Sequence, residues 1–242
     1  MRLRFVHTFF RVVPVLPWIL CAIATGQPLA LRFEHLSLKQ GLSQSVVNAI
    51  AQDRHGYMWF ATQDGLNRYD GYNFRVYRHD SADSTSLSDN YIWRLVCGRK
   101  GDLWVGTFKG GLNRYNPASE DFTSHQHDPA DSSSLSNNNV TAIYEDRRGT
   151  LWVGTWFGGL NRLEVSSSKG KFVHYRRDPG DVRSLSDDRV AAILEDSHGD
   201  LWVGTWNGLN KLDRATGRFA RYSRREGDSQ SLSSNMIWSM CE

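Results

Sequence analysis

The chain has 242 residues, of which 29 are lysine or arginine and 26 are aspartate or glutamate, for a formal net charge of +3. The first 26 residues hold three arginines and no acid, so the remainder carries 26 basic and 26 acidic groups. A balanced chain without a basic stripe lacks the electrostatic footprint of a nucleic-acid-binding protein, and we expect no nucleic-acid partner.

Residues 1–26 predict a secretory signal peptide. Three arginines precede an apolar stretch over residues 12–24, and small residues around Ala24 suit cleavage. The apolar stretch is short for a transmembrane helix. The alternative is an uncleaved N-terminal anchor. We therefore expect an exported, periplasmic protein.

From residue 33 onward the chain is built of repeats. A segment resembling Leu-Trp-Val-Gly-Thr is followed shortly by Gly-Leu-Asn four times, and the successive tryptophans lie 45, 48 and 50 residues apart. Periods in this range are typical of repeat architectures. Each unit begins near a Ser-Leu-Ser segment, and the predicted units cover about 42–80, 87–127, 135–177 and 185–225.

The third unit shows the expected order of elements. Residues 140–145 are rich in β-branched side chains and end in an Asx-type turn closed by Gly149. A second strand follows over residues 151–155, where the small Gly154 would allow a neighbouring sheet to approach closely. Two further strands are expected at residues 160–163 and 171–175. Four strands per unit predict an all-β fold of propeller blades, each with four antiparallel strands.

The two ends of the repeat region predict partial strands. Residues 32–38 resemble an orphan fourth strand, and residues 232–242 form a partial fifth blade that ends within its first strand. A closed propeller removes its open edges by completing the last blade with an N-terminal strand. We therefore expect a fragment of a longer protein, with an open arc or a strained ring of four blades. It would lack about three blades if the ring has seven.

Together, the Ser-Leu-Ser, Gly-x-Leu-Trp-Val-Gly-Thr and Gly-Leu-Asn-Arg-Tyr patterns resemble the two-component regulator propeller repeats. The resemblance covers roughly residues 33–242. It implies a sensory β-propeller in front of a transmembrane signalling protein, either a hybrid histidine kinase or a diguanylate cyclase. The output domain and its transmembrane segment would then lie outside this chain, and the full-length protein would be a homodimer. The resemblance does not identify the ligand.

The sequence shows no catalytic constellation, metal centre or cofactor motif. His125 and His127 would share one strand face, but a carboxylate or cysteine partner at suitable spacing is missing, so a solvated strand end is favoured. The loops that begin at Asp80, Asp128 and Asp178 could offer oxygens to calcium, but their repetition favours capping turns that serve their own backbone. A disulfide between Cys97 and Cys241 is not expected, because they fall on strands three blades apart.

The repeated tryptophans could form a ligand platform, but their identical strand positions favour packing between blades. They are Trp59, Trp104, Trp152 and Trp202.

A better candidate site lies where the units differ. The loop that enters each blade and the second hairpin turn are expected on one face, and several turns there carry aromatic side chains. The predicted ligand-binding residues are Trp93, Phe108, Lys109, Trp156, Phe157, Trp206, Asn207 and Trp238. Aromatic rings beside polar groups suit a carbohydrate or another polar, partly apolar ligand. The alternative is that the rings fill the narrow central end of the propeller.

Three functions follow from these expectations. The first is a non-catalytic periplasmic sensor that binds an extracytoplasmic ligand or partner. The second is a free secreted binding or scaffold propeller, and the third is a propeller lyase or hydrolase, which the aromatic character of the turns disfavours.

Overall fold

The computed structural model describes residues 33–164 and 170–242. The predicted signal peptide lies outside these residues. The chain divides into two compact units, Met1–His35 and Leu36–Glu242, and the second contains all the repeats. Across the described ranges no helix is long and apolar enough to span a membrane.

Each repeat folds into one antiparallel sheet of four strands in chain order, which we call blades 1 to 4. The strands are β1 (Val47–Gln52), β2 (Met58–Thr62), β3 (Gly65–Tyr69) and β4 (Phe74–Tyr77) in blade 1; β5 (Ile92–Cys97), β6 (Leu103–Thr107), β7 (Leu112–Asn116) and β8 (Asp121–His125) in blade 2; β9 (Val140–Glu145), β10 (Leu151–Thr155), β11 (Leu160–Glu164) and β12 (Lys171–Tyr175) in blade 3; and β13 (Val190–Glu195), β14 (Leu201–Thr205), β15 (Gly208–Asp213) and β16 (Arg218–Tyr222) in blade 4.

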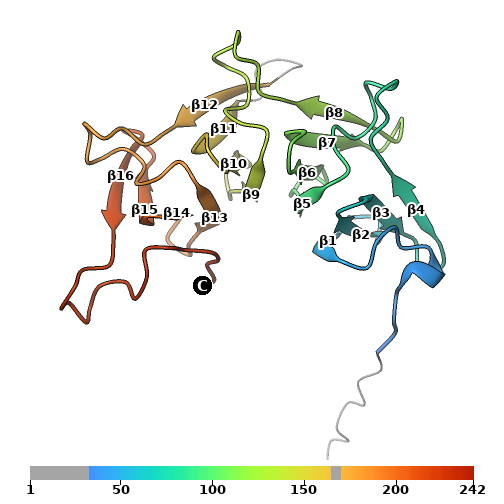
Figure 1. Cartoon of the computed structure of the whole chain (residues 1–242), viewed down its shortest axis with the longest axis horizontal. Coiled ribbons are helices and arrows are strands. Elements are labelled where there is room, and N and C mark those ends of the chain that lie inside the picture. Colours follow the sequence, from blue (N-terminus) through green and yellow to red (C-terminus); the bar gives the residue numbers. More distant parts are fainter. Residues whose placement is uncertain (1–32, 165–169) are drawn as a thin grey trace, which may run out of the picture. The chain divides into compact units, whose positions relative to one another are not determined.

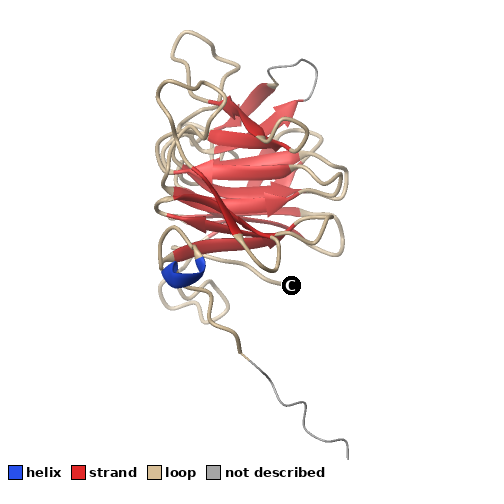
Figure 2. Cartoon of the chain, turned by 90° about the vertical axis from the view of Figure 1, so that its right-hand side faces the viewer, coloured by secondary structure: helices blue, strands red, loops and turns tan. Residues whose placement is uncertain are grey.

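Figure 1 shows the four sheets of the Leu36–Glu242 unit side by side in an open arc, with β1, β5, β9 and β13 along its inner side. The predicted four-stranded propeller blades are therefore confirmed, and the arc is open. Figure 2 shows the strands running across the unit with the loops gathered at its two opposite sides. Turns that share a register in different blades therefore share one face.

The second strand of each blade allows the next blade to approach closely. A Cβ atom added at Gly106 would lie 2.6 Å from Val140 Cγ1 of blade 3, and one at Gly154 would lie 2.5 Å from Val190 Cγ1 of blade 4. Real Cβ atoms do not come this close, so an alanine here would push the blades apart. The prediction for Gly154 is confirmed.

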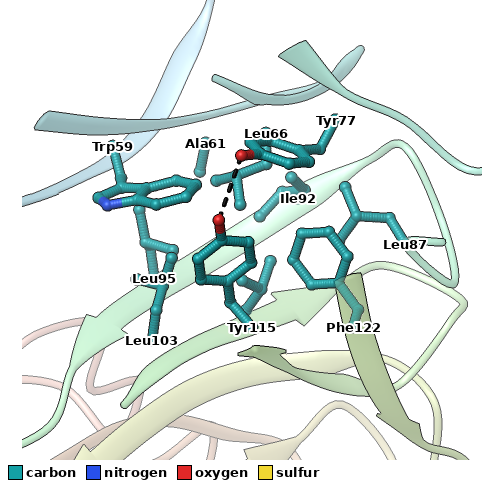
Figure 3. Packing of buried hydrophobic residues seen from close by; sticks show 11 residues of the cluster. Trp59, Ala61, Leu66, Tyr77, Leu87, Ile92, Leu95, Leu103, Tyr115 and Phe122 are labelled. Carbon is teal, nitrogen blue, oxygen red and sulfur yellow. Dashed lines mark hydrogen bonds between the residues drawn. The ribbon is translucent and has the colours of Figure 1, made fainter. Parts of the chain in front are cut away.

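The repeated tryptophans pack between blades, as predicted. Trp59 lies edge-on to Tyr115 of blade 2 with ring centroids 4.9 Å apart, within the cluster drawn in Figure 3. The tryptophans of blades 1 to 3 are 1–7% exposed, whereas Trp202 is only partly buried. Its outer neighbour would be a fifth blade, and the described residues supply only one segment of it.

Carboxylates fix the turns beneath these tryptophans. Asp146 accepts hydrogen bonds from the Trp152 indole nitrogen at 2.9 Å and from the Thr150 amide at 2.9 Å. Asp53 and Asp196 do the same for Trp59 and Trp202 in their own blades. A single side chain therefore orders both the turn and the ring that the next blade packs against.

Three glutamates, two at the ends of β9 and β13 and one in the C-terminal segment, tie their part of the chain to the preceding blade. Glu145 accepts from the Arg99 amide of blade 2 at 3.1 Å, and Glu195 accepts from the Arg147 amide of blade 3 at 2.7 Å. Glu242 accepts from the Ser197 amide of blade 4 at 2.9 Å. We call these bonds the glutamate ties.

The Ser-Leu-Ser and Gly-Leu-Asn segments hold each other. Asn161 is fully buried, and its Oδ1 accepts from the Ser136 amide at 3.0 Å. Asn67, Asn113 and Asn210 are equally buried and accept from the corresponding serines. Because a buried amide without partners is costly, the recurrent asparagine has a structural role.

The acidic loops serve their own backbone, as expected. Asp80 Oδ1 accepts from the Ala82 amide, and the Asp80 amide donates to Ser86 Oγ. The loops at Asp128 and Asp178 repeat both bonds.

The prediction of partial strands at the two ends was wrong. Residues 33–37 form no strand, and a capped 3-10 turn, η1 (Leu38–Gln40), replaces the extended chain. Residues 236–242 also form no strand, because none of the described strands pairs with them. The segment nevertheless lies where a fifth inner strand would begin. Ile237 approaches Gly204 as Val190 approaches Gly154, and its amide donates to the Thr205 carbonyl at 3.0 Å.

Candidate functional site

The entry loop and the second hairpin turn meet in blades 2, 3 and 4, as the sequence predicts. The Phe108 amide donates to the Tyr91 carbonyl at 2.9 Å in blade 2, and the Trp156 amide donates to Asn139 at 2.9 Å in blade 3. The Trp206 amide makes the same bond to Arg189 in blade 4 at 3.1 Å. Side chains from both loops therefore point from one shared face, which we call the turn face.

Every inner strand carries a β-bulge at the same register, next to this face. The bulge residues are Asn48, Trp93, Thr141 and Ala191, each unpaired between its neighbours. A bulge turns one side chain out of the ladder and is common beside functional sites. Asn48 Nδ2 uses this freedom to donate to the Ile92 carbonyl of the next blade at 2.8 Å, and Thr141 Oγ1 donates likewise to Val190.

Trp93 breaks this pattern and heads a cluster of three rings, the blade 2 cluster. Trp93 is stacked with Tyr91 and with Phe108, with ring centroids 5.8 and 5.7 Å apart, and Tyr91 lies 5.3 Å from Phe108. All three rings are partly exposed. Lys109 Nζ lies 5.8 Å from the Phe108 ring, so a cation borders the cluster.

A second group, the tryptophan row, runs from blade 3 to the C-terminal segment. Trp156 and Trp206 lie edge-to-face with centroids 4.9 Å apart, and Trp206 lies 5.5 Å from Trp238. Phe157 is 61% exposed and Trp238 is 54% exposed, so these rings do not fill a closed core.

Polar groups lie beside the row. Arg189 lies 4.8 Å from the Trp206 ring and pairs with Asp187 at 2.6 Å. Burial alone would raise the pKa of Asp187, but hydrogen bonds from Arg189 outweigh it and lower this pKa. The indole Nε1 of Trp206 is buried and has no hydrogen-bond partner among the described residues. Unpaired buried donors are rare in native proteins.

The structure thus divides the predicted residues between two groups. Trp93, Phe108 and Lys109 gather in blade 2, while Trp156, Phe157, Trp206 and Trp238 gather around the row. Asn207 is exposed on the turn next to Trp206. Whether these residues bind a ligand stays a prediction.

Sequence comparison alone missed Tyr91, Arg94 and Arg189. Arg94 follows the bulge, where the other blades have Ala49, Ala142 and Ala192. Aligning that one position across the four repeats would have singled it out.

The arrangement suits binding by stacking more than it suits chemistry. No group of three or more His, Cys, Asp or Glu able to hold a metal occurs within residues 33–164 and 170–242. His127 Nδ1 lies 2.9 Å from the Leu135 carbonyl and therefore serves its own loop. Cys97 and Cys241 are both free thiols, and burial raises the pKa of Cys97 to about 11, which makes it unreactive.

Comparison with known proteins identifies the family of the repeats. A sequence model of the family called two component regulator propeller matches residues 41–64, 86–109, 134–157 and 184–207. A curated relative, Histidine kinase P4 from Formosa agariphila, is 48% identical over 56 residues, which are 23% of this chain and 4% of that protein.

Solved structures agree with this assignment. The extracellular domain of the hybrid two component system BT3049 from B. thetaiotaomicron is 26% identical with a TM-score of 0.58, over 85% of this chain and 38% of that one. PorZ, a surface component of the type-IX secretion system of Porphyromonas gingivalis, shares the fold at 19% identity with a TM-score of 0.60, over 81% of this chain and 29% of that one. The chain thus spans well under half of each relative. Its four repeats belong to the two component regulator propeller family.

Proposed function

We propose that this chain is part of a non-catalytic periplasmic sensor propeller that binds a ligand on the turn face. Occupancy of that face would be passed to a histidine kinase or diguanylate cyclase output domain. The similarity to extracellular domains of hybrid two component systems supports the sensory role. The repeat family, named for two component regulators, points the same way.

The tryptophan row is the observation that carries the binding proposal. Three indole rings from two blades and the C-terminal segment adjoin at 4.9 and 5.5 Å, and the last remains 54% exposed. Blade 1 has Gln63 at the turn position of Trp156 and Trp206, so the blade frame does not require a ring there. Such rings, flanked by polar donors, stack on sugar rings and hydrogen-bond their hydroxyls. The supported ligand is therefore a carbohydrate or a similar polar, partly apolar molecule.

Signal transfer would use a dimer of propellers. A ligand shifts an equilibrium only through its different affinity for two states, so binding must favour one arrangement of the two propellers. The row includes a ring from the C-terminal segment, so a ligand there would contact the part of the chain that leads out of blade 4.

The test measures glycan binding by isothermal titration calorimetry with the full chain. Trp156→Ala combined with Trp206→Ala should weaken binding at least tenfold and change the melting temperature little. Trp238→Ala, at a more exposed ring, should also weaken binding and carries less folding risk. Gln63→Ala is the matched control, because Gln63 has the same turn position in blade 1 without a ring.

Two outcomes would contradict the proposal. If the Trp238 variant binds every glycan as well as the unmodified chain, the row is not a ligand site. Turnover of a glycan by the purified chain would instead favour a propeller lyase or hydrolase.

A further inference from the structure

Arg94 occupies a register that the other blades reserve for alanine. It lies on β5 directly after the bulge residue Trp93, and its ladder partner is Gly106. In blades 3 and 4 the matching pairs are Ala142 with Gly154 and Ala192 with Gly204. Blade 2 thus places an arginine directly after the turn-face residue Trp93, at a register where a methyl group satisfies the fold in the other blades.

The charge of Arg94 has no counter-ion among the residues that the structure describes. Its Nη1 donates to the neighbouring Trp93 carbonyl at 3.1 Å, and no described carboxylate forms an ion pair with it. Most other partly buried arginines have a carboxylate partner, and Arg221, which has none in the described part of the chain, instead donates to the carbonyls of Ser184, Asp181 and Leu185. Arg68 pairs with Glu120 at 2.9 Å, and Arg214 pairs with Glu195 at 2.8 Å and also with Asp146.

An unpaired, partly buried cation is unfavourable for folding. Burial lowers the pKa of Arg94, although the group remains charged at neutral pH. Its retention therefore requires a benefit that the fold alone does not give, and a bound anion would give one.

The surroundings of Arg94 fit a ring that carries an acidic group. Trp93 offers an indole face, and the exposed Lys109 adds a second cation beside Phe108. Asp89 is the acid of this entry loop, and its two carboxylate oxygens accept from the Tyr91 and Lys109 amides at 3.1 and 2.9 Å. The Asp89 carboxylate is therefore bound by backbone amides and forms no ion pair with Arg94 or with the Lys109 ammonium group.

We propose that Arg94, Lys109 and the Trp93 ring form an anion subsite of the turn face, which accepts a carboxylate or sulfate group carried on a stacked sugar ring. The proposal rests on the proposed ligand-binding function and narrows its ligand class to acidic saccharides. Arginine is suited to this role because its planar fork can bind either group through two parallel hydrogen bonds.

The first test compares oligogalacturonate, a sulfated galactan oligosaccharide and a neutral galactan oligosaccharide of equal length, by calorimetry on the full chain. Arg94→Ala should weaken the acidic ligand that binds at least tenfold and change neutral binding less than twofold. Arg94→Lys should keep part of the affinity. If Arg94→Ala weakens binding of oligogalacturonate, the subsite accepts a carboxylate. If it weakens binding of the sulfated galactan, the subsite accepts a sulfate. Equal losses for acidic and neutral ligands, or no loss, would overturn the subsite.

A second test does not depend on finding the ligand. Inorganic sulfate should raise the melting temperature of the unmodified chain more than that of Arg94→Ala, because an ion that binds only the folded state stabilises it. Arg99→Ala, at an exposed arginine beyond the end of β5, is the matched control and should respond like the unmodified chain. Equal responses in all three proteins would refute the anion subsite.

The two proposals can fail separately. If Trp238→Ala loses glycan binding but Arg94→Ala weakens acidic and neutral ligands equally, the ligand site on the turn face is supported and the anion subsite is refuted. If sulfate raises the melting temperature only when Arg94 is present, and the variants of Trp156, Trp206 and Trp238 bind glycans normally, the anion subsite is supported and the tryptophan row is not a ligand site. A marked fall in melting temperature of Arg94→Ala in the absence of ligand would show that Arg94 has a structural role and would also overturn the subsite.

Discussion

Blades 2 and 3 share most of their frame, and the difference that matters for the candidate site lies at two adjacent residues of the inner strand. Both carry the Leu-Trp-Val-Gly-Thr strand, the buried asparagine and the bulge of the inner strand. In blade 3 the bulge side chain of Thr141 is tied to blade 4, followed by Ala142. In blade 2 the same places hold Trp93, which stacks on Tyr91 and Phe108, and Arg94. Blade 2 therefore has a ring cluster where blade 3 has an inter-blade hydrogen bond, while the core of both blades stays the same.

The largest effect is expected in the frame. Trp152→Ala should lower the free energy of unfolding by about 3–5 kcal/mol, because it empties a buried site between blades 3 and 4. Trp202→Ala removes the same side chain from a half-buried position and should cost clearly less. Urea denaturation measures both, and equal losses would show that packing between blades does not account for the repeated tryptophans.

Arg214→Met tests the ion pair of Arg214 with Asp146, which joins blades 3 and 4, and its pair with Glu195 within blade 4. It leaves Asp146 and Glu195 buried without a cation, and the expected loss is about 3 kcal/mol at neutral pH. Arg78→Met, at an exposed pair with Asp64, should cost less than about 1 kcal/mol.

The difference between unmodified chain and Arg214→Met should shrink in acid. Burial would raise the pKa of Asp146, but hydrogen bonds from Arg214 and Trp152 lower it. A lowered carboxyl pKa contributes stability above its unfolded value, and this stability is lost as pH falls through the folded pKa. Denaturation at neutral pH and at about pH 3 measures the change. A gap that is independent of pH would contradict the ion-pair explanation.

Thr141→Val addresses the tie that blade 2 lacks. Loss of the hydrogen bond to the Val190 carbonyl should cost about 1 kcal/mol in free energy of unfolding. Thr141→Ser keeps the hydroxyl and should retain most of the stability. If both substitutions cost the same, the methyl group matters and the tie does not.

The smallest effect on stability is expected for Trp93→Thr. This change gives blade 2 the bulge residue of blade 3, so stability should change by less than about 1 kcal/mol while acidic-glycan binding is lost. Denaturation and calorimetry on the same variant measure both. A loss above about 2 kcal/mol would place Trp93 in the core and remove the contrast between the blades.

The blades could be predicted from sequence because their strands and turns repeat. Because Trp59 and its equivalents recur at the same strand position in all four repeats, their packing between blades could be predicted. The small Gly154 likewise predicted that the neighbouring sheet approaches closely there. The end segments could not be predicted, since a strand such as residues 236–242 exists only when a partner strand lies beside it. Arg94 stands out in the sequence only when its position is aligned with Ala49, Ala142 and Ala192, and its lack of a carboxylate partner among the described residues is visible only in the structure. The aromatic residues of the turns could be predicted from sequence. Their division into the blade 2 cluster and the tryptophan row could not, because the bulge at Trp93 is visible only in the structure.

The glutamate ties give the array a direction. The turns of blades 2, 3 and 4 are each completed by a glutamate that comes later in the chain, namely Glu145, Glu195 and Glu242. Because repeat proteins gain stability through nearest neighbours, each of these three blades is finished only once the segment that follows it is in place. During synthesis from the N-terminus, a blade of this kind would reach its full stability only after the next segment has been made. The most recently synthesised blade would therefore be the least stable one.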